Sequence, residues 1–372
     1  MKSYMTFAWM SHDAEDSGAP LSSSKQYQFG KRTLFMKSQN IRNIMNVSAL
    51  ALGLVGVAGS AWATVETTSP VYVGAATTIQ GNGGSGAHYT YFSQRMVNPI
   101  SYAGKISNVQ GGNLVDTNAS WVDSQFGTNG TQAYVEFDNG MMVDVATTSA
   151  GAQSLVLAGG LSGVASAGDA YRVRAHWTIA SLFGTNNEAG LKGSFTPSKA
   201  DNIQLQIPQT QQTMTIFYLN AGLTPGWYRA DGTPAANQIV YPEEGIIVKR
   251  TDVSDVNLFT CGPVKVGTTV APVETGYNLV GTLKSLTDVT LANLGLYTGN
   301  PATGLASGTR PGTADSLLVQ QADGSSKTYF YLTSVGWFDN VGNPSDTVTM
   351  KAGSAFFIKR NGSPFSWTIP AE

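Results

Sequence analysis

Two nearly identical strand endings constrain this chain more than any other feature. GIIVKR stands at residues 245–250 and AFFIKR at residues 355–360. The spacing from Trp227 to Arg250 equals the spacing from Trp337 to Arg360. Further matches precede both endings in the same order: TIASL at 178–182 with TLANL at 290–294, Ala-Asp at 200–201 with 314–315, and FYL at 217–219 with 330–332. The sequence therefore predicts an internal duplication.

The local patterns indicate strands and tight turns. Charged residues make up only 12% of the chain, which contains 42 glycines and 10% aromatic residues, as is typical of β-rich proteins. YRVRAHW at 171–177 alternates, with Arg172, Arg174 and His176 on one face. AYVEF and MMVDV flank Asn139-Gly140, a dipeptide that favours a hairpin turn. We predict an all-β protein.

The duplication and the spacing of its parts predict the domain organisation. Two copies are too few for a solenoid, so we expect them to form one β-sandwich-like body. The segment 101–176 interrupts the first copy and is predicted to be a small inserted β-barrel. Residues 96–100 faintly resemble 278–282, which precede the second copy. The expected parts are N-terminal strands at 64–100, the barrel at 101–176, β repeat one at 177–275 and β repeat two at 276–372.

Residues 36–63 have the features of a Sec-type signal peptide. MKSQNIR at 36–42 is short and basic, 47–58 is an uncharged apolar run, and Ala61-Trp62-Ala63 is a small-x-small cleavage signal. The apolar run is too short to span a bilayer as a helix. We interpret 1–35 as a disordered segment upstream of the true start. The mature chain is expected to begin at Thr64 and to have no integral membrane span. We expect it to be exported to the periplasm, to the cell surface or into the medium.

The order of these segments carries a resemblance to a known family. ISNV at 106–109, AYVEFDNG at 133–140, Gly168-Asp169 leading into WTIASLF at 177–183, and the final AFFIKR follow one another along the chain. This order resembles an uncharacterised family of exported, internally duplicated β-rich proteins from verrucomicrobial bacteria. The resemblance covers roughly residues 71–360. It implies export and a duplicated β fold, and it implies no activity, cofactor or catalytic residue.

Charge and glycine patterns argue against nucleotide chemistry. The formal net charge is −2 and no basic cluster occurs, so nucleic acid is not an expected partner. GNGGSG at 81–86 matches G-x-G-x-x-G. A dinucleotide site would also need a following helix and an acidic residue about twenty positions on. HYTYF follows instead, and no carboxylate occurs between Glu66 and Asp116. We interpret 81–86 as a flexible loop.

Metal and cofactor sites are not expected. His88 and His176 are the only histidines after the signal peptide, and Cys261 is the only cysteine. A site built from these donors would need more of them. The alternation at 171–177 predicts a solvated His176, and Cys261 is expected to be a small buried hydrophobic residue.

Adjacent carboxylates offer one catalytic alternative. On a strand, Glu243 and Glu244 would point to opposite faces, unlike the facing acid and base of a glycosidase. We interpret them as a solvated turn before the strand 245–250. If the chain is an enzyme, Glu243 or Asp201 is its candidate carboxylate.

A polar loop in the second copy offers a calcium alternative. Carboxylate and amide oxygens lie close together there and could bind Ca²⁺, but no EF-hand pattern supports it. Turn formation is the preferred interpretation. The residues are Asp339, Asn340, Asn343 and Asp346.

Equivalent aromatic pairs are the candidate ligand-binding residues. Trp227-Tyr228 and Trp337-Phe338 occupy the same place in each copy. If each Trp points inward on its strand, its neighbour points outward, and two outward rings could stack on sugars. Core packing of these rings is the preferred alternative.

Two further pairs of segments occupy equivalent places. The polar loops 184–199 and 298–313 are long enough to be functional or mobile. Lys249-Arg250 and Lys359-Arg360 are interpreted as charged strand ends that discourage edge pairing, with polyanion binding as the alternative.

These observations predict a non-enzymatic exported structural or surface-interaction protein of the bacterial cell envelope. Its expected partners are polysaccharides, other envelope components or further copies of itself. A carbohydrate-binding β module is the alternative, and an outer-membrane barrel or a glycan-active enzyme is less favoured.

Overall fold

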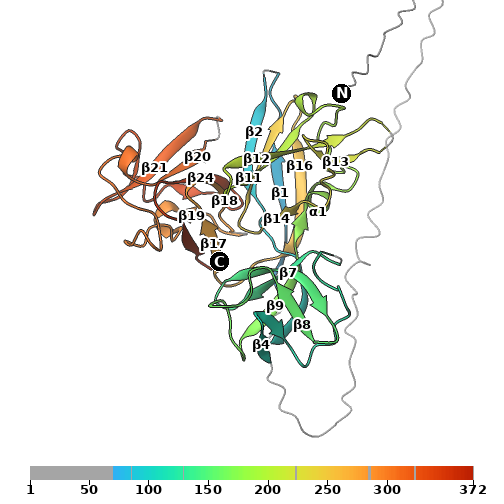
Figure 1. Cartoon of the computed structure of the whole chain (residues 1–372). Coiled ribbons are helices and arrows are strands. Elements are labelled where there is room, and N and C mark those ends of the chain that lie inside the picture. The colour runs from blue at the N-terminus through green and yellow to red at the C-terminus, as the bar shows by residue number, and fades with distance from the viewer. Residues whose placement is uncertain are drawn as a thin grey trace, which may run out of the picture. The chain divides into compact units, whose positions relative to one another are not determined.

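The computed structural model describes residues 70–371, apart from 85, 129, 223, 284–285 and 322–323. The predicted signal peptide at 36–63 and the segment at 1–35 lie outside these residues. The described chain is built from antiparallel strands, with α1 (Ile179–Phe183) and short 3₁₀ turns between them (Figure 1). The predicted all-β class is confirmed. None of the described helices is long and apolar enough to cross a membrane.

Two five-stranded sheets have the same strand order. The first is β13-β12-β11-β15-β2 and the second is β22-β21-β20-β24-β18. The strands of the first sheet are β2 (His88–Ser93), β11 (Asn202–Ile207), β12 (Gln212–Leu219), β13 (Gly226–Arg229) and β15 (Gly245–Arg250). Those of the second are β18 (Gly276–Gly281), β20 (Ser316–Gln320), β21 (Ser326–Leu332), β22 (Gly336–Asp339) and β24 (Ala355–Arg360).

The elements around these sheets are duplicated as well. Two pairs flank the first sheet, β1 (Tyr72–Ile79) with β16 (Val256–Pro263) and β10 (Trp177–Thr178) with β14 (Ile239–Val240). The second sheet has β17 (Thr269–Val273) with β25 (Phe365–Ile369) and β19 (Val289–Thr290) with β23 (Thr349–Met350). The helix α1 corresponds to a 3₁₀ turn at Leu291–Asn293, and Pro197–Lys199 corresponds to Pro311–Thr313. The internal duplication therefore extends through the whole set of elements.

Strand pairing corrects two details of the predicted repeats. Because β15 pairs with β2 as β24 pairs with β18, His88 is the counterpart of Gly276, and the faint match at 96–100 is wrong. The pairing of β17 with β25 also places the start of the second repeat at Thr269, ahead of the predicted 276.

The segment inserted into the first repeat forms a sheet of its own, drawn in green in Figure 1. Its order is β3-β9-β6-β7-β8-β5-β4, and β7 pairs with β6 through its first half and with β8 through its second. The two ends of this order, β3 and β4, are separated in the chain only by Ile106 and Ser107, so the sheet curls around one core. The strands are β3 (Ile100–Lys105), β4 (Asn108–Gln110), β5 (Asn113–Val115), β6 (Ala133–Phe137), β7 (Met142–Ser149), β8 (Ser154–Leu157) and β9 (Ala170–Ala175).

Each unit has its own hydrophobic core. The first repeat packs Trp227 and Ile246 among its aliphatic residues, the second packs Trp337 and Phe356, and the insert packs Val135. Apolar residues that alternate along the strands supply these cores, as the pattern of period two predicts. The hairpin between β6 and β7 has Gly140 at φ +86°, the backbone conformation that made Asn-Gly a turn signal.

A buried ion pair explains the repeated Lys-Arg endings. Arg250 is 2% exposed and Arg360 is 4% exposed. Arg250 Nη1 lies 2.8 Å from Asp201 Oδ2, and Arg360 forms the equivalent pair with Asp315. Both strands are interior strands of their sheets. The prediction that these charges protect a strand edge is therefore wrong for the arginines. Each arginine pairs with the aspartate of the Ala-Asp motif, which also occurs in both copies.

The same aspartates hold the long loops. Asp201 accepts hydrogen bonds from the backbone N–H groups of Lys192 (2.6 Å) and Thr251 (2.7 Å). In the second copy, Asp315 accepts from Ala306 (2.7 Å) and Asn361 (2.7 Å). Loops 184–199 and 298–313 are thereby attached to the sheets at equivalent points.

We predict that Arg360→Met lowers the free energy of unfolding by about 3–5 kcal/mol, because it leaves the buried Asp315 carboxylate without its cation. The adjacent Lys359 is exposed, so Lys359→Met should cost less than about 1 kcal/mol. Chemical denaturation of both variants measures this difference. Equal losses in the two variants would contradict the role given to the ion pair.

Candidate functional site

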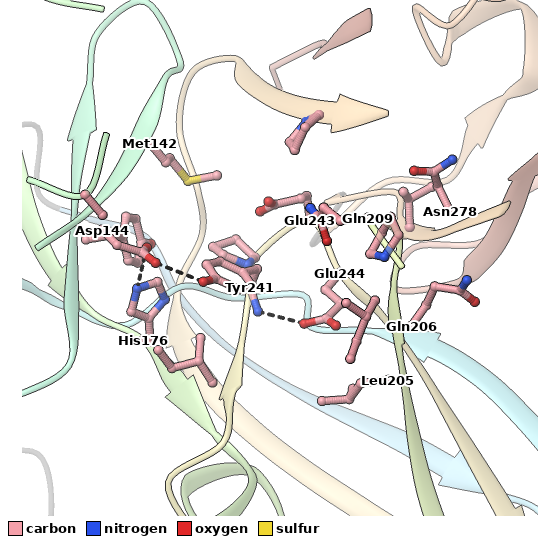
Figure 2. A pocket seen from close by; sticks show the side chains of 18 of the residues that line it. Met142, Asp144, His176, Leu205, Gln206, Gln209, Tyr241, Glu243, Glu244 and Asn278 are labelled. Carbon is pink, nitrogen blue, oxygen red and sulfur yellow. Dashed lines mark hydrogen bonds and ion pairs between the residues drawn. The ribbon is translucent and has the colours of Figure 1, made fainter. Parts of the chain in front are cut away.

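A pocket of about 700 Å³ receives side chains from the insert, the first repeat and the second repeat (Figure 2). The insert contributes Asp144 and His176. The first repeat contributes Tyr241 and Glu243, and the second contributes Asn278. The volume lies within the range of small-molecule sites.

The loop between β14 and β15 places the carboxylates in this pocket. Its turn is closed by a hydrogen bond from the Glu244 N–H to the Tyr241 carbonyl (3.1 Å), and the Glu243 carbonyl accepts from the N–H of Gly281 in the second repeat (2.8 Å). Gly245 permits this close approach, because a Cβ there would lie 2.7 Å from Leu279 Cγ. The loop therefore joins both repeats.

Asp144 links the insert to this loop. Its Oδ1 lies 3.0 Å from His176 Nε2, and its Oδ2 accepts a hydrogen bond from the Tyr241 hydroxyl (2.8 Å), as the dashed lines in Figure 2 show. Burial acts to raise the pKa of Asp144, but the bonds from His176 and Tyr241 outweigh it and hold the pKa below its usual value. Asp144 is therefore ionised at neutral pH.

His176 is buried, and the prediction that it is solvated is wrong. It is 5% exposed, with its ring 4.9 Å from the ring of Tyr134 and 5.2 Å from that of Tyr241, centroid to centroid. The alternation at 171–177 correctly separates the two faces of the strand. Tyr241 covers His176 on the polar face, which sequence alternation alone does not reveal.

A second buried network lies on the same polar face. Glu136 accepts from Arg174 Nε (2.7 Å) and from Lys265 Nζ (2.8 Å). Burial raises the pKa of Glu136, but the two cations outweigh it and lower the pKa below its usual value. Because Lys265 belongs to the segment between β16 and β17, this network ties the insert to the connection between the repeats.

Glu243 and Glu244 lie in a turn, as predicted, but they are half-buried in the pocket. The prediction that this turn is solvated is therefore wrong. Burial raises the pKa of Glu243 to about 7 and that of Glu244 to about 8. The negative charge of Asp144 adds to the shift at Glu243, and that of Glu243 adds to the shift at Glu244. Glu244 accepts a bond from the Tyr241 N–H (3.2 Å).

Four residues lining the pocket have a buried polar atom without a hydrogen-bond partner among the residues that the structure describes. These atoms are Tyr134 Oη, His176 Nδ1, Arg229 Nε and Glu243 Oε2. Buried polar groups in proteins are nearly always hydrogen-bonded. Their concentration in one pocket marks it as the candidate binding site.

The predicted aromatic pairs do not line this pocket. Trp227 and Trp337 are each 2% exposed and belong to the cores of the repeats, so neither indole is available to stack on a sugar at the surface. Trp227 also donates from Nε1 to the Gly184 carbonyl (2.7 Å). Tyr228 and Phe338 are half-buried on β13 and β22, the end strands of the two sheet orders.

The other candidate residues have structural surroundings. Asp201 lies in the ion pair with Arg250. Asp339 accepts from the Asn343 N–H (2.8 Å) and pairs with Lys327 (2.9 Å), which is a turn arrangement. His, Cys, Asp and Glu side chains form no group of three that could hold a metal among the described residues.

Cys261 is exposed, and the prediction that it is buried is wrong. On β16 it falls on the same side as Phe259, which is also exposed, and opposite to Leu258, which is buried. The alternation of this strand, and not the apolar character of the thiol, decides its position.

Sequence reasoning missed the pocket because its residues come from three separate units. One signal was present. Glu243 and Glu244 align with Gly353 and Ser354 in the second copy. The two copies therefore differ at these positions, although the strand endings that follow them are similar.

Comparisons with protein-family models, with curated proteins and with solved structures found no match for this chain. The resemblance to a verrucomicrobial family therefore stays a prediction, and the site is assessed from its own chemistry.

We predict that Glu243→Gln raises the free energy of unfolding by about 1–3 kcal/mol at about pH 8.5 and leaves it nearly unchanged at about pH 4. A carboxyl whose pKa is raised from 4.5 to about 7 on folding holds its proton more tightly in the folded state. Its contribution to stability is therefore lost as the pH rises through that interval. The amide cannot ionise and avoids this loss.

Denaturant unfolding at both pH values measures the effect, with the exposed Glu188→Gln as control. The pKa of Glu188 is lowered by hydrogen bonds from backbone N–H groups, so its amide should give no gain at alkaline pH. A destabilised Glu243→Gln at about pH 8.5 would contradict the burial of this carboxyl.

Proposed function

We propose that this chain is a non-enzymatic exported binding protein of the bacterial cell envelope, and that its ligand site is the pocket around Glu243. The observation that carries the proposal is the set of unpartnered buried atoms on Tyr134, His176, Arg229 and Glu243, which line a single pocket. A ligand that bonds to these atoms would offset the cost of burying them, which is about 1–3 kcal/mol for each unsatisfied group.

The hydrogen bonding of Asp144 favours binding over glycoside hydrolysis. A glycosidase needs two carboxyl groups that both face the scissile bond. Both oxygens of Asp144 are engaged, one by His176 and the other by Tyr241. Asp201, the other carboxylate considered from the sequence, is held by Arg250. Neither Asp144 nor Asp201 therefore offers Glu243 a free carboxylate partner, and Glu244, the other carboxyl group of the pocket, accepts a hydrogen bond from the Tyr241 N–H (3.2 Å).

A carbohydrate-binding surface is the second candidate, and one observation favours it. Tyr228 and Phe338 occupy equivalent positions in the two repeats, opposite the buried tryptophans, and remain half-buried. Their rings could stack on the faces of sugars. Rings on the end strands of two sheets would contact a polymer, whereas the pocket would bind a small molecule or the end of a chain.

One binding experiment separates these two sites. Purified protein is tested against insoluble polysaccharides by pull-down, and against soluble oligosaccharides and peptidoglycan fragments by calorimetry. The Tyr134→Phe/Glu243→Gln variant removes the pocket contacts, and the Tyr228→Ala/Phe338→Ala variant removes the two half-buried rings. We expect the pocket variant to lose binding to a soluble fragment by about tenfold or more and the ring variant to retain it.

Loss of polymer binding in the ring variant alone would favour the carbohydrate-binding surface. Retention of all binding in the pocket variant, or turnover of a fragment into products, would overturn the proposal of a non-enzymatic pocket site. The cell-envelope location rests on the predicted signal peptide at 36–63 and is part of the same proposal.

A further inference from the structure

We propose that the pocket recognises a ligand carrying a primary ammonium group, seated against Tyr134, His176 and Glu243. This inference rests on the proposed function, since it names the chemical class of the molecule that enters the same pocket. It stands on three features of the site: the hydrogen-bonding type of the unpartnered atoms, the balance of charge, and the aromatic rings beside them.

The unpartnered atoms of these three residues can all accept hydrogen bonds. The Asp144 carboxylate can only accept, so in the neutral imidazole the hydrogen lies on His176 Nε2 and Nδ1 presents a lone pair. Glu243 Oε2 and Tyr134 Oη provide two further acceptors. A primary ammonium has three N–H donors and no acceptor, which matches the lone pairs of this set, while the hydrogen of the Tyr134 hydroxyl needs an acceptor from another part of the ligand. A sugar hydroxyl, with one donor and two lone pairs, matches it less well.

Two of the three acceptors are rigidly held. Tyr134 is 2% exposed on β6, and His176 is fixed by the bond to Asp144 and by the flanking tyrosine rings. Preorganised groups lose little conformational freedom when a ligand binds. Burial raises the pKa of Tyr134, and the charges of Glu136 and, to a smaller extent, Glu243 add to this rise, so the hydroxyl stays protonated.

The charges that face Glu243 favour a cation. Asp144 from the insert and Glu244 from the same loop are acidic. Lys265 is already bonded to Glu136 and to the Thr268 carbonyl, and Arg229 donates to Gln238 (2.6 Å). Gln238 is a neutral partner, so Arg229 keeps its positive charge at the pocket. Three carboxyl groups, those of Asp144, Glu243 and Glu244, line the pocket with this one guanidinium, so an ammonium group would add positive charge where carboxyl groups predominate. Complementary charge of this kind contributes strongly to specificity.

The aromatic rings and Arg229 define the rest of the ligand. The rings of Tyr134 and Tyr241 both contact His176, and the faces of such rings attract ammonium groups. Arg229 Nε is an unpartnered donor in the same pocket, so the ligand should also carry an acceptor such as a hydroxyl group. A small amine with hydroxyl groups, of which an amino sugar is one source, fits this description.

The test uses three matched disaccharides and one simple diamine. The disaccharides are the glucosamine dimer, its N-acetylated form and the uncharged glucose dimer, and the amine is 1,5-diaminopentane. Calorimetry on the whole protein measures each affinity. We expect the glucosamine dimer to bind at least about tenfold more tightly than either neutral disaccharide, and the diamine to bind as well, because it carries the ammonium without the sugar.

The variants assign the contacts. Glu243→Gln should weaken binding of the glucosamine dimer by at least about tenfold, and Tyr134→Phe by about fivefold. Glu188→Gln is the control and should bind as the unchanged protein does. The stability of Glu243→Gln at alkaline pH verifies that this variant is folded.

The diamine also permits a test by pH. An ammonium ligand favours the ionised form of Glu243, so its binding displaces a proton and its affinity should rise from about pH 6 to about pH 8. Glu243→Gln should abolish most of this rise. Asp144, Glu244, Tyr134, Tyr241, His176, Arg229 and Lys265 are the other titratable or charged groups near the site.

The outcomes separate this inference from the proposed function. Equal or tighter binding of the neutral disaccharides would overturn the ammonium inference and leave a pocket that binds sugars. Failure of both amines to bind would overturn it as well. Binding of the amines that survives both Glu243→Gln and Tyr134→Phe would place the ammonium elsewhere and contradict the inference.

Discussion

The buried arginine–aspartate pair in each repeat is the interaction on which the rest of the structure depends. Arg250 with Asp201, and Arg360 with Asp315, join the last interior strand of each sheet to the start of the strand beside it. The same aspartates hold the backbone of a long loop. Removing one partner would leave an uncompensated buried charge, so the pair keeps sheet and loop in a fixed relation. The first sheet thereby fixes β15 and the loop that precedes it, which carries Glu243.

The candidate site arises where the two repeats differ. The symmetric parts of the chain build cores and ion pairs, and these occur twice. Glu243 and Glu244 replace the glycine and serine of the second copy, and the insert places Asp144, His176 and Tyr134 against them. Duplication supplies the scaffold, while the insert and one altered turn supply the chemistry. This division explains why the part of the pocket that the insert builds has no counterpart in the second repeat.

The fold was more predictable from the sequence than the site. The matched endings and the Trp-to-Arg spacing predicted the duplication, because equivalent strands need equivalent residues at buried positions. The role of the arginines was missed, because their partners Asp201 and Asp315 are distant in the sequence. His176 was misplaced because strand alternation tells which face a residue lies on, but not whether another segment covers that face. Cys261 was misplaced because its burial was predicted from the apolar character of the thiol and not from its place on the strand. Three units contribute residues to the pocket, and no local sequence pattern predicts which distant segments lie together in the fold.

The titration of Glu243 is the sharpest test of whether this pocket is desolvated. Nuclear magnetic resonance of protein labelled at the glutamate side-chain carboxyl carbons follows each group with pH, and Glu243→Gln identifies the signal. We expect a midpoint of about 7 for this signal, because the carboxyl lies in a desolvated pocket with one oxygen unpaired. A midpoint near the ordinary value of 4.5 would show a carboxylate in water, and would contradict the site on which the proposed function rests.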